Sequence, residues 1–201
     1  MSVGFGGAIG SPRPGGSSSF SLAGVTSGDP ILLFSASATN TPSDSFSTPY
    51  TWTDAGSGGF LYLQVGQGGA GTSGTINGTS IICAVSLTGA SKAAGAGLVD
   101  SYAGGTSESS TQPVTPSVSG EAVLALITGP DFGVQWSGPT PLVSGNLIEG
   151  YPSYILVGDT GIAPGTPVTF SYGTFGGFSH NISVVVFPSA PPTTAQLCMP
   201  L

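Results

Sequence analysis

The chain has 201 residues, and glycine and proline make up about a quarter of them. Two basic and nine acidic side chains leave a formal net charge of −7. Without a Gly-X-Y period, so much glycine and proline is typical of disordered segments. Disordered chains, however, combine low hydrophobicity with high charge, whereas this chain is 39% hydrophobic and only 5% charged. We therefore expect one folded domain with a sizeable core.

The shortage of cations excludes several classes of function. Arg13 and Lys92 are the only basic side chains, so no basic stripe neutralises nucleic-acid phosphates, and electrostatic attachment to anionic membranes is disfavoured. No apolar run reaches the roughly 18 to 20 residues that span a bilayer. The first residues, MSVGFGGAIG, lack the charged and apolar regions of a signal peptide, so we expect release into the cytoplasm of the cell that makes the protein.

Short apolar runs recur between clusters of Gly, Pro, Ser, Thr and Asn, and none has helical periodicity over ten or more residues. This pattern predicts an all-β protein, namely a two-sheet antiparallel β-sandwich of the jelly-roll type with about eight strands. The predicted strands are 19–25, 30–38, 59–66, 79–88, 121–128, 153–158, 166–173 and 180–187.

The two ends differ in composition from the single predicted sandwich domain, residues 19–187. Residues 1–18 are rich in Gly, Pro and Ser, and residues 188–201 are rich in proline, which removes a hydrogen-bond donor from a ladder. They are either frayed termini or arms that neighbouring subunits order, since their apolar side chains would otherwise meet water. The arm residues predicted to contact another subunit are Phe5, Ile9, Leu197, Met199 and Leu201.

Motifs for cofactors are weak. Gly66, Gly68 and Gly71 match G-x-G-x-x-G, but the residues that follow are typical of strands and turns, so no helix N-terminus is expected to hold a pyrophosphate. Within that segment, Asn77 and Gly78 predict a hairpin turn. We expect no cofactor.

The residues needed for catalysis or metal binding are also scarce. His180, the only histidine, opens a predicted strand, and no Gly-x-Ser-x-Gly elbow is present. Cys83 lies in an apolar run and is interpreted as a buried side chain, whereas Cys198 lies in the proline-rich tail; a disulfide between them is disfavoured. No ligand set has the spacing of a metal site, so we expect no metal and no enzymatic activity.

Two further kinds of side chain leave functional alternatives open. Paired carboxylates on a jelly roll are typical of carbohydrate-active enzymes, but the nine acids are scattered singly along the chain and most occur in turn-forming contexts. Exposed aromatic residues stack on sugars. Tyr50 and Tyr102 are available for this role, and the candidates for glycan stacking are Trp52, Trp136 and Tyr151. Aromatic residues in all-β domains also fill cores, so these three residues are open to either interpretation.

An order of short motifs extends over roughly residues 19–190. It contains SGDPILLFSASA (27–38), Trp52-Thr53, FLYLQVG, SIICAVSLTGAS, SGEAVLALIT (119–128) and SVVVFPSA. This order resembles the jelly-roll modules of bacteriophage virion proteins and of some actinobacterial surface proteins. Asp29 is followed by Pro30 where such modules have an aliphatic residue, so the strand is expected to begin one residue later or to lie at an edge.

The resemblance implies a structural or adhesive role without catalytic residues. We expect a non-enzymatic virion protein, a capsid decoration or cement protein on the outer surface of a phage head. It would act as a homo-oligomer, with a trimer as the first expectation, and bind other copies of itself and other virion proteins. The outer surface is favoured because a shell that lines packaged DNA needs cations. The alternative is a glycan-binding adhesion module of a phage tail, a fibre or a cell surface.

Overall fold

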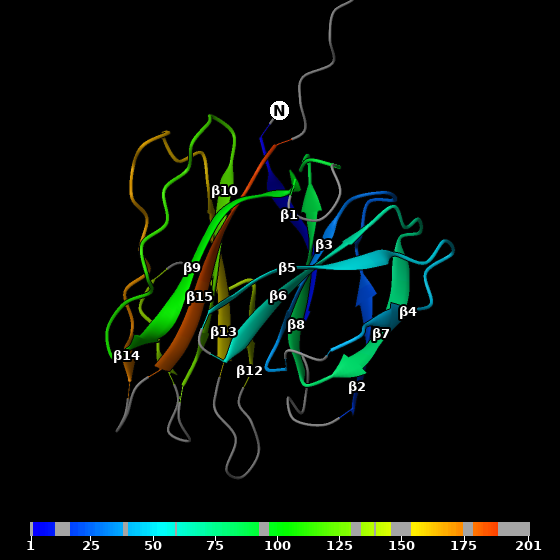
Figure 1. Cartoon of the computed structure of the whole chain (residues 1–201), viewed down its shortest axis with the longest axis horizontal. Coiled ribbons are helices and arrows are strands. Elements are labelled where there is room, and N and C mark those ends of the chain that lie inside the picture. The colour runs from blue at the N-terminus through cyan, green and yellow to red at the C-terminus, as the bar shows by residue number, and fades with distance from the viewer. Residues whose placement is uncertain are drawn as a thin grey trace, which may run out of the picture.

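The computed structural model describes residues 2–10, 17–37, 40–58, 60–92, 97–129, 134–138, 140–145, 154–174 and 179–188. They form antiparallel sheets, which confirms the all-β class, and Figure 1 shows the three larger sheets side by side. The first sheet has the order β1 (Gly4–Gly10), β8 (Ile81–Thr88), β3 (Ile31–Ser35), β6 (Leu61–Gln67) and β5 (Thr51–Gly58). The second has the order β12 (Val143–Gly145), β13 (Tyr154–Thr160), β10 (Ala122–Thr128), β15 (Ser179–Val186) and β9 (Val99–Ser107). The third consists of β2 (Ser17–Ala23), β7 (Ser73–Thr79) and β4 (Ser43–Asp44).

The central strands of the first sheet are buried on both faces. Leu32 and Phe34 of β3 pack against the second sheet, whereas Ile31 and Leu33 pack against the third. Side chains alternate between the faces of a strand, so a strand covered on both sides needs an unbroken apolar run, and all four residues are fully buried. The two large sheets form the expected sandwich, but the third sheet is a layer that the two-sheet prediction lacked. The jelly-roll connectivity stays a prediction.

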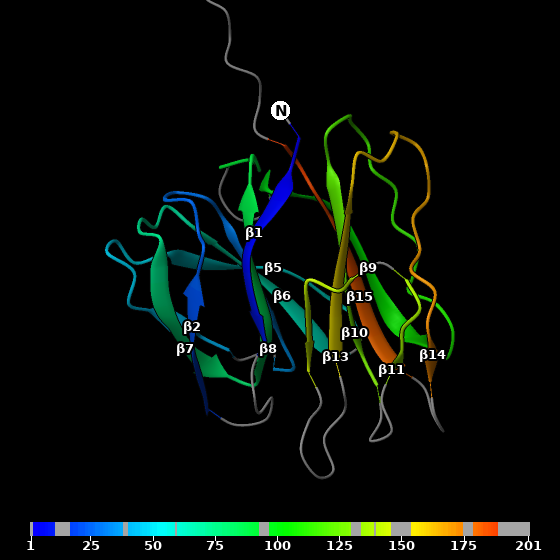
Figure 2. The same ribbon diagram turned by 180° about the vertical axis from the view of Figure 1, so that it is seen from behind.

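The outer face of the second sheet is also covered, although mostly by irregular chain. Val123 and Val185 pack beneath Val114 and Val168, and the last two residues form an isolated bridge. Figure 2 shows the short pair β11 (Val134–Gln135) and β14 (Gly173–Thr174) lying outside β10 and β13. Residues 166–173 were predicted to be a strand, but they pair with the chain mainly at single positions.

The edges of the two large sheets meet where β5 lies beside β9. A Cβ on Gly58 would overlap the Cα of Gly104, and a Cβ on Gly104 would overlap Gly58. Only glycine allows this approach between the two backbones. The two edge strands therefore pack closely against one another at this point.

The N-terminal segment corrects the prediction of an arm over residues 1–18. Residues 4–10 form β1 in the first sheet, paired with β8, and the partly buried side chains of Phe5 and Ile9 pack against two core clusters of the same chain. Small residues permit this placement: Gly7 donates its N–H to the Gly24 carbonyl (3.0 Å) and has no room for a Cβ beside Ala23. The apolar surface that suggested a contact with another subunit is thus covered within the chain. Leu197, Met199 and Leu201 lie outside the described residues.

Several strands escaped the sequence analysis because they are polar and rich in glycine. These are β5, β7 and β9, with the sequences TWTDAGSG, SGTINGT and VDSYAGGTS. The predicted hairpin turn at Asn77-Gly78 is wrong because both residues lie within β7. The chain turns instead at Ser80, which has a positive φ of 53°. The strand predicted from residue 30 begins at Ile31 and occupies a central position, between β8 and β6.

Truncation of a side chain between the large sheets tests this core. Phe34 is fully buried, whereas Phe60 is 67% exposed. We expect Phe34→Ala to lower the free energy of unfolding by about 3 to 5 kcal/mol, because it removes apolar burial and leaves a cavity. Phe60→Ala is the matched control and should cost about 0.5 kcal/mol or less in dilute protein. Denaturant titration measures both, and equal costs would contradict the assigned core.

Candidate functional site

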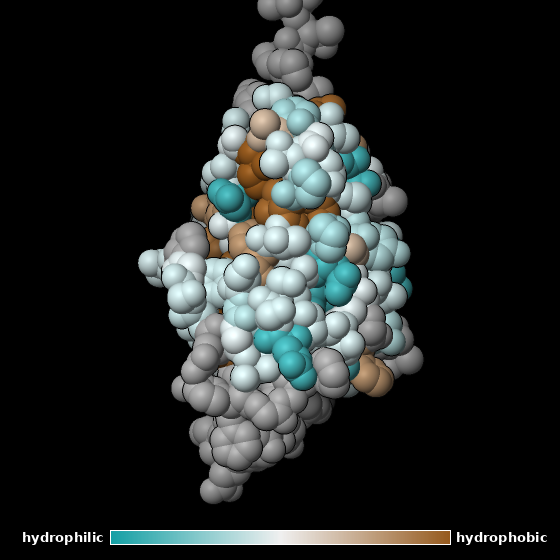
Figure 3. Space-filling view, turned by 90° about the vertical axis from the view of Figure 1, so that its left-hand side faces the viewer, coloured by the Kyte–Doolittle hydropathy of each residue, from teal (hydrophilic) through white to brown (hydrophobic). Residues whose placement is uncertain are grey.

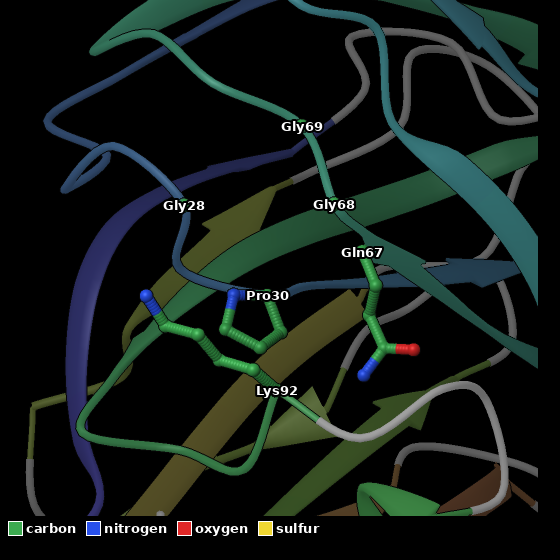
Figure 4. A pocket seen from close by; sticks show the side chains of 6 residues that line it. All are labelled: Gly28, Pro30, Gln67, Gly68, Gly69 and Lys92. Carbon is green, nitrogen blue, oxygen red and sulfur yellow. The ribbon is translucent and has the colours of Figure 1, made fainter.

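A hollow of about 240 Å³ lies between the segment before β3 and the end of β6. Its lining consists of Gly28, Pro30, Gln67, Gly68, Gly69 and Lys92. Figure 4 shows the Lys92 side chain lying across Pro30, with its ammonium group toward Gly28. The volume is below the range typical of small-molecule sites, and Lys92 is the one ionisable side chain in the lining. The hollow therefore contains no pair of groups for acid–base chemistry.

Asp29 lies between two residues that line this hollow, and its side chain is buried. Its Oδ2 atom has no hydrogen-bond partner. Burial raises the pKa of the Asp29 carboxyl, while the charge of Lys92 and a hydrogen bond with Thr26 act in the opposite direction. Burial thus makes the ionised form of Asp29 less favourable than it is in water.

The glycines of the G-x-G-x-x-G match lie on the other side of this hollow. Gly66 belongs to β6, and Gly68 and Gly71 follow it with φ angles of 74° and 127°. The next element is the strand β7. The expectation of a strand after these glycines is therefore confirmed, and no helix N-terminus is present here to bind a pyrophosphate.

Trp52 is held by a carboxylate that the sequence analysis did not single out. Asp44 Oδ2 accepts hydrogen bonds from the Trp52 Nε1–H (2.9 Å) and the Tyr50 N–H (3.0 Å), while Oδ1 accepts one from the Phe46 N–H (3.2 Å). The Trp52 ring packs over Gly66, and the side chain is partly buried. Asp44 therefore orders residues 44–52 and fixes the orientation of the indole. An Asx turn, in which Asp bonds the N–H two residues on, was the available sequence signal.

The hydroxyl of Tyr50 connects this region to Asp29. It donates a hydrogen bond to the Asp29 carbonyl oxygen (3.1 Å). Burial, together with the charges of Asp29 and Asp44, raises the pKa of Tyr50 to about 12. The hydroxyl thus stays neutral and acts as a donor that joins the 44–52 segment to the start of β3.

Trp136 lies on the far side of the molecule from Trp52, over the outer face of the second sheet. Its ring is partly buried, packs in the cluster of Ala125, Ile155 and Val157, and lies 6.4 Å from the Phe170 ring, centroid to centroid. The structure therefore separates the two tryptophans, and neither is fully buried. Tyr151, the third stacking candidate, lies outside the described residues.

Two aromatic residues near β5 and β9 are more exposed than either tryptophan. Phe60 and Tyr102 are 67% and 46% exposed. The Phe60 ring stands edge-on to the His180 imidazole, with centroids 5.0 Å apart, and the Tyr102 ring lies against Gly56. We name the surface around Gly56, Phe60, Tyr102 and His180, together with the close contact between Gly58 and Gly104 beside it, the β5–β9 seam.

Tyr102 and His180 of the β5–β9 seam lie within a few residues of each other along the sheet. Val184 and Thr106 are the ladder partners of Tyr102 and His180, respectively. Tyr102 and Thr106 are four residues apart on β9, which corresponds to about 13 Å along a strand. The sequence analysis missed this surface because it joins two polar, glycine-rich strands from different sheets.

The scattered acids do not assemble a carboxylate pair in a cleft among the described residues. Asp54 accepts a hydrogen bond from Gln64 (2.8 Å), and Glu108 and Asp159 are exposed. Asp100 and Glu121 are in contact, but Glu121 is fully buried. A substrate has no access to such a pair, so it does not provide the geometry that glycoside hydrolysis requires.

The stability conferred by Asp29 is expected to depend on pH. Since burial raises its pKa, the folded state binds the proton more tightly than the unfolded state. The free energy of unfolding should therefore fall as pH rises from the ordinary value of about 3.8 through the folded pKa. Asp29→Asn cannot ionise, so its stability relative to the native protein should increase from pH 4 to pH 8.

Thermal unfolding at several pH values measures this difference. The exposed Asp159 provides the control, because Asp159→Asn should follow the native protein at each pH. A constant difference between Asp29→Asn and the native protein would contradict the role of burial.

The described residues show neither a metal cluster nor a membrane-spanning helix. Within the described ranges, no three His, Cys, Asp or Glu side chains cluster to bind a metal, and no helix is long and apolar enough to cross a membrane. Cys83 is buried as expected, and burial raises the pKa of its thiol; Cys198 is not among the residues described.

Comparison of the chain with family models, curated proteins and solved structures found no match.

Proposed function

We propose that the protein is a non-enzymatic structural component of a phage virion, a decoration or cement protein on the outer surface of the head. It acts as a symmetric homo-oligomer that stabilises the shell through contacts between subunits. The observation that carries this proposal is the β5–β9 seam, where Phe60 and Tyr102 are exposed beside a glycine backbone. Exposed aromatic anchors on a surface with little charge are typical of protein–protein contacts.

The surrounding surface supports the same conclusion. Figure 3, seen from the side of β9 and β14, shows mainly neutral residues, few strongly hydrophilic ones and several apolar residues at the surface. With 5% charged residues, the chain has little electrostatic repulsion to oppose association. The lack of cations favours the outside of the shell over the face that meets packaged DNA. Contacts between copies would lower the free energy of the assembled shell by mass action.

Light scattering and sedimentation of the purified protein test the association. We expect an oligomer that shifts toward monomer in the double variant Phe60→Ser, Tyr102→Ser, because both apolar anchors are lost. Val118, which is 44% exposed outside the seam, provides the control Val118→Ser, which should keep the oligomer. A native protein that stays monomeric at high concentration and does not bind phage heads would overturn the proposal. An oligomer that the double variant leaves intact would move the contact away from the seam.

A glycan-binding adhesion module is the second candidate, and the partial exposure of the tryptophans favours it. The test is made at Trp136, whose ring is partly buried over the outer face of the second sheet. If glycan binding occurs here, Trp136→Ala should abolish the signal on a glycan array, whereas Phe60→Ala should retain it. Absence of binding by the native protein would remove this candidate.

A further inference from the structure

The third sheet has an edge strand, β2, that lies apart from the edges of the two large sheets. Those edges lie next to each other, β5 beside β9 and β1 beside β12. In the third sheet, one edge is the two-residue strand β4, and the other is β2, which pairs with β7 along its whole length. Figure 2 shows β2 next to β7. The side of β2 that faces away from β7 is therefore a candidate site for the addition of a further strand.

Hydrogen bonds on the other side of β7 show in which direction its backbone groups point. The Ser45 N–H donates to the Thr75 carbonyl oxygen (3.0 Å), and the Thr75 N–H donates to Ser45 Oγ (3.0 Å). The Thr79 N–H donates to Asn40 Oδ1 (2.8 Å). Backbone groups of successive strand residues point to opposite sides. Thr75 and Thr79 thus face β4, and Ile76, which lies between them, faces β2.

The register then decides which backbone groups of β2 are bonded within the sheet. Phe20 pairs with Ile76, so Phe20 and, two residues further on, Leu22 exchange hydrogen bonds with β7. Ser19 and Ser21 alternate with them, and their N–H and C=O groups point away from β7. In the part of the chain that the structure describes, none of these four groups has a hydrogen-bond partner. Both serines are exposed.

The approach of β1 to the end of β2 agrees with this direction. The Gly24 carbonyl oxygen accepts a hydrogen bond from the Gly7 N–H (3.0 Å), and the Ala23 carbonyl oxygen lies against Gly7. Ala23 is two residues beyond Ser21, so both carbonyl groups leave β2 on the same side. The backbone of β1 closes the edge at Ala23, and the groups left open are those of Ser19 and Ser21.

β2 carries none of the features that usually prevent a sheet edge from pairing with another chain. Its sequence, SSSFSLA, has no charged residue and no proline, and its register with β7 contains no bulge. β7, with the sequence SGTINGT, is also uncharged. Copies of a chain with a net charge of −7 repel each other where acids face one another. Pairing along β2 brings no such charges together.

We propose that β2 pairs with the β2 strand of a second copy, in antiparallel orientation about a two-fold axis. The Ser19 and Ser21 N–H groups of each copy donate to the carbonyl groups of the same two residues in the other copy. Each strand thus gives and receives an identical set of hydrogen bonds, as a two-fold contact requires. The two third sheets join into one continuous sheet. This contact lies apart from the β5–β9 seam and does not rest on the proposed role in a virion.

Amide hydrogen exchange of the native protein at two concentrations tests the pairing directly. In dilute protein, the Ser19 and Ser21 amides should exchange quickly, whereas the Phe20 and Leu22 amides, which bond β7, should be protected. At high concentration, the protection factors of Ser19 and Ser21 should rise at least tenfold. Rapid exchange of both serine amides at every concentration, or protection that is already complete in the monomer, would contradict the proposal.

A proline variant tests the same contact by sedimentation equilibrium. Ser19→Pro removes an outward N–H but no hydrogen bond to β7, a geometry that tolerates proline at an edge. It should raise the dissociation constant of the dimer at least tenfold, whereas the matched control Ser19→Ala should keep the native value. Ser21→Lys adds the kind of charge that protects natural edges and should weaken the dimer if Ser19→Pro folds poorly. Equal association of Ser19→Pro and Ser19→Ala would overturn the contact.

The double variant Phe60→Ser, Tyr102→Ser separates this contact from the seam. The rise in protection of Ser19 and Ser21 with concentration should persist in the double variant. Loss of that rise would assign the association to the seam and overturn the β2 contact. A protein that does not bind phage heads would lose its proposed function but keep this contact, because the two amides report the pairing with no phage head present.

Discussion

Burial of the central strands of the first sheet on both faces is the constraint on which the rest of the structure depends. Its central strands β3 and β8 contribute apolar side chains to the contact with the second sheet and to the contact with the third. Because apolar burial scales with the area removed from water, a sheet covered twice supplies stability that a chain with so few charges does not obtain from ion pairs. The third sheet, polar on its outer side, then presents serine, threonine and asparagine to solvent.

Glycine makes the close approaches between these layers possible. The β5–β9 seam requires Gly58 and Gly104 to meet backbone to backbone, and β1 requires Gly7 to pass beside Ala23. The high glycine content that first suggests disorder therefore serves close packing at these positions.

The scarcity of charge gives individual carboxylates defined structural roles. Asp44 orders a loop through three hydrogen bonds, whereas Asp29 and Glu121 are buried without full partners. A charge in such a place is expensive, and burial raises the pKa of both carboxyls. The proposed assembly and these incompletely paired acids follow from one compositional fact, because a chain with two basic residues neither repels its copies strongly nor neutralises all its buried acids.

The amino-acid sequence by itself determined the all-β class, seven of the strand cores and the burial of Cys83, since apolar runs report which backbone enters a core. The run ILLF also contained the information that both faces of β3 are covered, although the two-sheet prediction did not use it. Strands β5, β7 and β9 carry no such signal, because their stability comes from neighbours that supply the apolar contacts. Asn77 and Gly78 favour a turn locally, yet the pairing of β7 with β2 and β4 keeps them extended. Only the tertiary structure placed Asp100 beside Glu121 and Phe60 beside His180, because these residues are distant in sequence and the register between strands, which no local pattern encodes, decides which side chains meet.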